Sequence, residues 1–147
     1  MFLALVTLGY VSGIMLALIQ SGMTPHGIAT YYLGDETRLI FPKSYRGLLE
    51  TTHFHLFSAS IIFLVLTHLF LLSQLSHHLK IWLICLTFGG LLAEIASPWL
   101  IRYNGAGWSW MMAVSGPLLS LGSLAMVAIL IREIWFIGLG TGGTENL

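Results

Sequence analysis

Three histidines lie in one long apolar segment, where an ionisable side chain would be costly inside a membrane. His53, His55 and His68 all fall in the run from Glu50 to Phe70, which is otherwise mostly aliphatic and aromatic. Neutral imidazole is a ligand of haem iron, zinc and copper. Ionisable groups at membrane depth usually have a function. This segment is therefore the first candidate for a cofactor site.

Helical geometry gives these histidines depths and directions. At 1.5 Å and about 100° per residue, His53 and His68 lie about 22 Å apart along the axis and about 60° apart around it. His55 points about 140° away from His68, whereas Glu50 lies directly above His68 on the helical wheel. The spacing predicts a polar stripe of Glu50, His53 and His68, with room for one cofactor towards each membrane surface.

This spacing resembles that of the membrane-bound b-type cytochromes, in which histidines thirteen to fourteen residues apart on one helix serve two stacked haems. His55 and His68 have that separation, and His53 and His68 come close to it. The resemblance implies one or two haems b, with His53 or His55 as the ligand near one surface and His68 as the ligand of a second haem. It also implies electron transfer within a larger redox complex, with a quinone as a possible redox partner.

The second axial ligand is not evident from the sequence. Two-haem cytochromes b take two histidines from each of two helices, whereas the other three apolar segments of this chain contain none. A second ligand could come from a symmetry mate in a homo-oligomer, from another membrane subunit, or from elsewhere in the chain. The candidates within the chain are His26, His77, His78, Met111, Met112 and Met126.

Two other functions fit the same residues. Glu50 and His53 have the i, i+3 spacing that directs a carboxylate and an imidazole to one metal, and His55 and Glu94 could complete a copper, zinc or iron site. The chain could instead be a cofactor-free accessory or anchoring subunit of a membrane complex. In a purely structural role, Glu94 would pair with Arg102 or Tyr103.

Composition places the chain in a membrane. Of its 147 residues, 56% are hydrophobic and 8% are charged, where a soluble domain has about a quarter charged residues. The formal net charge is zero, so there is no basic surface for nucleic acid. Cys85 is the single cysteine, which excludes an intrachain disulfide and a c-type haem attachment. An electron-carrying or accessory subunit is a better interpretation than a self-contained enzyme.

Four apolar segments are long enough to cross a bilayer core of about 30 Å. They predict an all-α fold, a four-helix bundle in one transmembrane domain over 1–147, with spans at about 2–19, 45–73, 80–100 and 110–137. We expect an integral membrane protein in contact with the lipid bilayer, most simply in a bacterial inner membrane.

The connection between the first two spans carries a further helix signal. Thr24 is a favourable N-cap, Pro25 suits the first helical position, and Gly34 suits the end. The pattern predicts a short helix in the headgroup region, and Ser44 is placed to cap the span that follows.

Overall fold

The helices are those that the apolar segments predict. The computed structural model describes residues 1–137. The long helices are α1 (Phe2–Ser21), α3 (Tyr45–Leu71), α4 (His77–Asn104) and α5 (Ser109–Arg132). The short elements are α2 (Pro25–Leu33), the 3-10 turns η1 (Glu36–Arg38) and η2 (Ala106–Trp108), and a π-helical turn, η3 (Glu133–Ile137). The predicted all-α fold, with four spanning helices and a short helix after the first, is confirmed.

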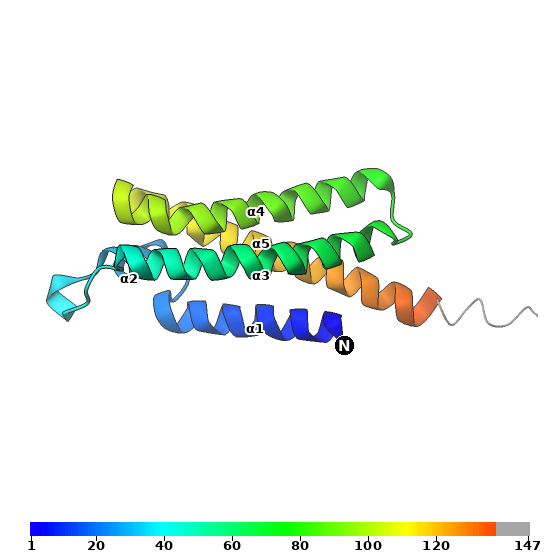
Figure 1. The fold of residues 1–147 in the computed structure, drawn as a ribbon, viewed down its shortest axis with the longest axis horizontal. Helices are drawn as coiled ribbons and strands as arrows, with labels where there is room; N and C mark the ends of the chain where they lie inside the picture. Colours follow the sequence, from blue (N-terminus) through cyan, green and yellow to red (C-terminus); the bar gives the residue numbers. More distant parts are fainter. Residues whose placement is uncertain (138–147) are drawn as a thin grey trace, which may run out of the picture.

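The four long helices run along a common direction, as Figure 1 shows. Helix α3 packs against α4 and α5, while α1 packs against α5 and α2. Helix α2 also contacts α4 and α5, so it covers the end of the bundle at which α1 ends and α3 begins (Figure 1). Helices α1, α2 and α3 therefore all pack against α5, and α2 and α3 also pack against α4.

Local side-chain signals set the start of α2 and α3. The hydroxyl of Thr24 accepts a hydrogen bond of 3.1 Å from the backbone N–H of Gly27, and Pro25 occupies the first turn. Ser44 accepts an equivalent 3.1 Å bond from Gly47. These caps satisfy backbone donors that the first turn leaves unpaired. Gly34 ends α2 with a positive φ of 85°.

Small residues let α4 and α5 approach more closely than any other pair. A Cβ atom on Gly90 would lie 3.2 Å from the backbone nitrogen of Leu119, and one on Gly122 would overlap Thr87 Oγ1. Close approach through small side chains is the usual way in which helices associate in lipid. The α4–α5 pair makes the most extensive helix–helix contact of the bundle.

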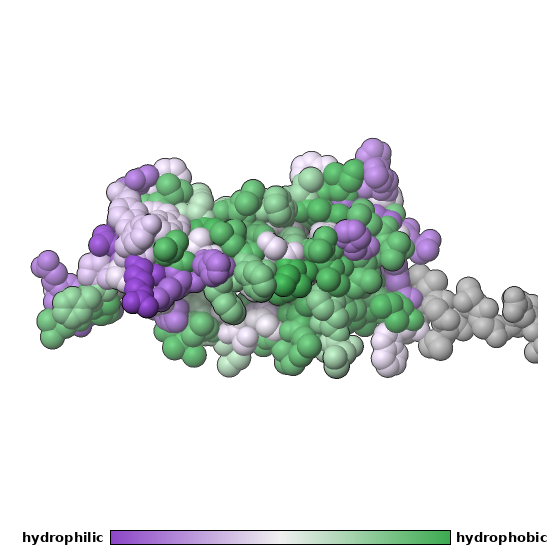
Figure 2. All heavy atoms as spheres, viewed as in Figure 1, coloured by the Kyte–Doolittle hydropathy of each residue, from purple (hydrophilic) through white to green (hydrophobic). Residues whose placement is uncertain are grey.

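The outer surface is apolar around the middle of the bundle. Figure 2 shows hydrophobic residues along its length and hydrophilic residues gathered towards the two ends. The interior holds two apolar clusters, one of α1, α3 and α5 around Leu66 and Met126, and one of α2, α3 and α4 around Tyr32 and Ile101. All four long helices are apolar enough to cross a membrane, and their exposed apolar side chains are suited to lipid.

Candidate cofactor site on helix α3

The three histidines of α3 are all exposed in the single chain. The buried side chains of this helix are Leu48, Phe63, Leu66 and Phe70, which face α4, α5 and α1. His68 points about 175° away from the mean direction of those four side chains. The predicted stripe of Glu50, His53 and His68 therefore lies on the outer face of the bundle, and its imidazoles project outwards.

The imidazole of His68 is held in one orientation by its own helix. Its Nδ1 lies 2.8 Å from the carbonyl oxygen of Leu64. A carbonyl oxygen can only accept a hydrogen bond, so Nδ1 carries a proton, and in the neutral imidazole Nε2 keeps a free electron pair. A hydrogen bond from one ring nitrogen to a backbone carbonyl is the usual support of a metal-binding histidine. His68 has the tautomer that an axial ligand needs.

His53 and His55 lie on different flanks of α3. His53 points about 115° away from the buried side chains, whereas His55 points only about 45° away from them. His55 is nevertheless exposed, and its ring makes an edge contact with Phe54 at a centroid distance of 6.4 Å. His53 shares the outer stripe with His68, but His55 does not.

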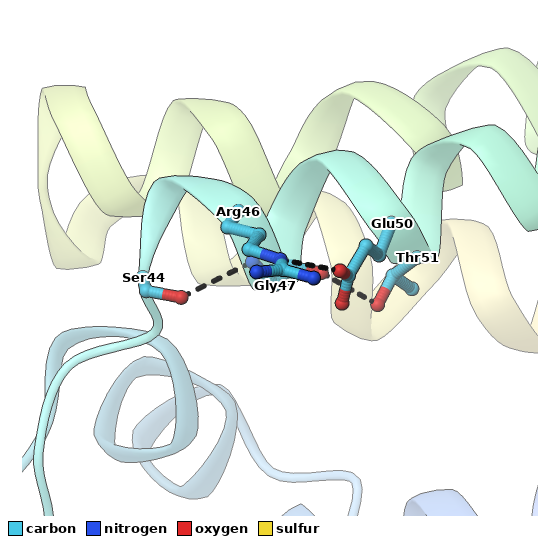
Figure 3. A network of polar contacts seen from close by, with 5 residues as sticks. All are labelled: Ser44, Arg46, Gly47, Glu50 and Thr51. Carbon is cyan, nitrogen blue, oxygen red and sulfur yellow. Dashed lines mark hydrogen bonds and ion pairs between the residues drawn. The ribbon is translucent and has the colours of Figure 1, made fainter.

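Glu50 is paired within α3. Its Oε1 accepts a hydrogen bond of 2.7 Å from Nε of Arg46, and Figure 3 shows both side chains on the outside of the helix. The two side chains are 63% and 88% exposed. An exposed pair of this kind contributes about 0.3–0.5 kcal/mol to stability. Its main effect is to neutralise the charge on this part of the stripe.

Glu94 faces the interior of the bundle. Its Oε2 accepts a hydrogen bond of 2.8 Å from the hydroxyl of Ser115 on α5. This partner differs from the expected Arg102 or Tyr103, and Arg102 instead donates to the backbone carbonyl of Lys43 at 3.0 Å. The difference arises from helix packing, because α4 turns the face that carries Glu94 towards α5. The sequence of α4 alone does not determine this rotation.

Tyr32 of α2 lies close to the same carboxyl. Burial, and then the charges of Glu94 and Tyr31, raise the pKa of Tyr32 above its ordinary value. The phenol is therefore neutral at physiological pH. Tyr32 lies on the short helix that the sequence predicts for the headgroup region, yet it is only 8% exposed and packs against Ile28 and Leu48. Glu94 and Ser115 thus form a polar pair between α4 and α5, and Tyr32 on α2 is near enough to this pair for its pKa to be affected by the charge of Glu94.

Two contacts between α3 and α4 fix the depth of Glu94 relative to α3. The indole Nε1 of Trp99 donates to the hydroxyl of Thr52 at 2.8 Å, and the rings of Phe63 and Phe88 meet at 6.3 Å. Because α3 and α4 run in opposite directions, counting residues between these two contacts puts Glu94 level with Phe57. This level is about one turn further along α3 than His53.

The structure does not bring the alternative metal ligands together. Glu50 points outwards and is paired with Arg46, whereas Glu94 points inwards to Ser115. Across residues 1–137, no three His, Cys, Asp or Glu side chains converge on a position for a metal ion. The set of Glu50, His53, His55 and Glu94 is divided between the two sides of α3 and the interior.

The candidate second haem ligands of the chain are also placed apart from the histidine stripe. Met126 is fully buried in the apolar cluster around Leu66, and Met112 packs beside the cluster that contains Tyr32. His26 is exposed on α2, and His77 and His78 are exposed at the start of α4. Both methionines have packing roles in the interior, while His68 faces outwards.

Sequence reasoning missed Ser115 as a partner of Glu94. One signal gives the depth of Ser115 but not its direction, because the short turn around η2 makes α4 and α5 run back along each other. Residues at similar distances from Gly105, where α4 ends, must then lie level, and Glu94 precedes Gly105 by eleven residues while Ser115 follows it by ten.

Comparison with known proteins agrees with this architecture. Residues 22–140 match a family described as a transmembrane helical domain, a stretch that includes all of α2, α3, α4 and α5. Neither a curated protein nor a solved structure matches the chain. The match covers most of the sequence, and the chain therefore belongs to this family of transmembrane helical domains.

Proposed function

We propose that this protein carries electrons as a haem b subunit of a membrane redox assembly, with His68 and His53 of α3 as ligands of haem iron. The observation that carries the proposal is the 2.8 Å contact from His68 Nδ1 to the carbonyl of Leu64. It leaves Nε2 free and aimed away from the bundle. Bound haem b would supply an iron that cycles between its ferrous and ferric forms.

The position of the two histidines supports one haem near each membrane surface. His53 lies eight residues after the start of α3, and His68 lies three residues before its end. Their separation of about 22 Å along the axis leaves space for two cofactors. Phe57 and Leu64, which lie between them on the same side of α3, are 67% and 60% exposed and can pack on the faces of two porphyrins.

The cost of a polar group in lipid also supports a cofactor or a protein partner on this face. Histidine within a spanning helix usually faces a bundle interior or a functional site. By contrast, the exposed surface of α1 carries no ionisable side chain and can lie in lipid without such a cost. A respiratory or photosynthetic membrane, such as a bacterial inner membrane, is the setting in which we place this activity.

The test is the visible spectrum of the purified full-length protein, expressed with an adequate haem supply. We expect the sharp reduced-minus-oxidised bands of low-spin haem b, with the His68→Ala variant losing one spectral component. His55→Ala is the matched control, because His55 is also exposed but lies off the stripe, and the spectrum of this variant should be unchanged. Protein without haem in every preparation would contradict the proposal. Elemental analysis would then separate a metal site from a cofactor-free accessory subunit.

A further inference from the structure

We infer that a second copy of this chain completes the haem sites, with α3 facing the partner's α3 about a two-fold axis along the membrane normal. His68 and the partner's His68 would bind one haem, and His53 and the partner's His53 would bind the other. This inference rests on the proposed function and adds the identity of the missing ligands.

The first argument is depth. Two copies in one membrane have the same orientation, so a two-fold axis along the normal brings each residue to the level of its own counterpart. An interface of this kind is isologous, with the same patch on both partners. Each level of α3 offers one imidazole where a six-coordinate haem needs two, and the symmetry supplies the other without any further residue.

The second argument is direction. His53 and His68 lie about 60° apart around α3, so an axis passing between them is within about 30° of both. That axis lies on the face opposite Leu66 and Phe70, against which no other helix of residues 1–137 packs. His55 lies far from that direction. The geometry therefore selects His53 and His68 and leaves His55 outside the shared site.

The third argument is charge and surface chemistry. The other ionisable residues of this face, Arg46 and Glu50, neutralise each other at 2.7 Å, so two copies meet without net repulsion. Between the histidine levels the face is largely apolar, with Phe57, Ile61 and Leu64 all at least half exposed. An apolar strip between two polar levels fits porphyrins and a second helix better than lipid, which offers no partner to imidazole.

The fourth argument is the fixed tautomer of His68. Because Nδ1 is bound to the Leu64 carbonyl in one copy, symmetry gives the same bond in the partner. Both Nε2 atoms then face the axis with free electron pairs, which is the arrangement for two neutral imidazoles on one iron. We expect two haems for every two chains.

The experiment uses mixed dimers. Wild-type chain and the His68→Ala variant, carrying different affinity tags, are co-expressed and purified through both tags. In this mixed dimer the haem at the His68 level has one imidazole, so its low-spin signal should disappear completely and high-spin haem should replace it. Millimolar free imidazole should restore the low-spin signal. The matched mixed dimer with His55→Ala should keep the full signal.

Different results would overturn different statements. Retention of half the low-spin signal at the His68 level would mean that each chain holds its own haem and would overturn the shared site. Failure of two tagged wild-type copies to purify together, with haem present, would overturn it too. Absence of haem from all preparations would instead contradict the proposed function. His68→Met, which keeps an axial ligand, guards against a folding defect: its mixed dimer should remain low-spin with a shifted spectrum.

Discussion

Glu94 on α4 accepts a hydrogen bond of 2.8 Å from Ser115 on α5, and this bond joins the two helices that pack most closely in the bundle. A carboxyl group inside a membrane bundle needs a partner, because lipid supplies none. Gly116, next to Ser115, also lies against the carboxyl group, since a Cβ atom there would be in van der Waals contact with Oε2 of Glu94 at 3.4 Å. The α4–α5 contact therefore combines close backbone approach with a buried polar bond.

Ser115→Ala should destabilise the protein by about 1–2 kcal/mol, because it leaves the carboxyl of Glu94 without its donor. The measurement is unfolding by heat or by denaturing detergent, followed by circular dichroism. Ser12→Ala is the control, since the Ser12 hydroxyl is exposed and donates to Gly9 in its own helix. Equal stability of the two variants would show that the Ser115 bond contributes nothing.

Gly122→Ala should cost about 1–3 kcal/mol, because the added methyl group would overlap Thr87 Oγ1 across the α4–α5 contact. Adding Thr87→Ala removes that atom. The stability lost by the double variant should therefore be smaller than the sum of the losses of the two single variants. Gly89→Ala is the control, since its methyl group would meet nothing within 4 Å. Strict additivity of the two substitutions would contradict the predicted overlap.

Asp35, in the connection between α2 and α3, should respond to the loss of Thr37. The hydrogen bond from the Thr37 side chain is the largest cause that lowers the pKa of Asp35 below its ordinary 3.8. The ionised carboxylate therefore stabilises this turn above pH 3.8, and the effect is lost as the pH falls through the lowered value. Thr37→Val should raise the pKa towards 3.8 in an NMR titration, while Thr51→Val on α3 should leave it unchanged.

Elements with local signals could be predicted from the sequence. Thr24, Pro25 and Gly34 define α2 because capping depends on a few neighbouring residues, and the structure has each of them in the expected place. The long helices follow from apolar length in the same way. The shared stripe of His53 and His68 also needs only helical periodicity.

The partners of the histidines on α3 and of Glu94 could not be predicted, because they depend on which face of each helix turns inwards. Histidines that bind a cofactor in a bundle are expected to point to its interior, yet His68 points away from it while Met126 on α5 points in. The partner of Glu94 depends on the rotation of α4 against α5. Periodicity fixes relative directions on one helix, and only packing decides which direction is the inside.

The lengths of the helices have a consequence for the bilayer around the protein. Helix α1, with 20 residues, is about 30 Å long and matches an ordinary hydrocarbon core, whereas α3 and α4, with 27 and 28 residues, are about 40 Å long. Figure 1 shows both ends of α1 lying inside the ends of α3 and α4. Arg46, Lys80 and Arg102 all lie in the end turns of the longer helices, where each donates a hydrogen bond to Glu50 or to a backbone carbonyl of the protein. We expect hydrophobic mismatch to be taken up at these charged helix ends, which extend beyond α1 on both sides of the bundle (Figure 1).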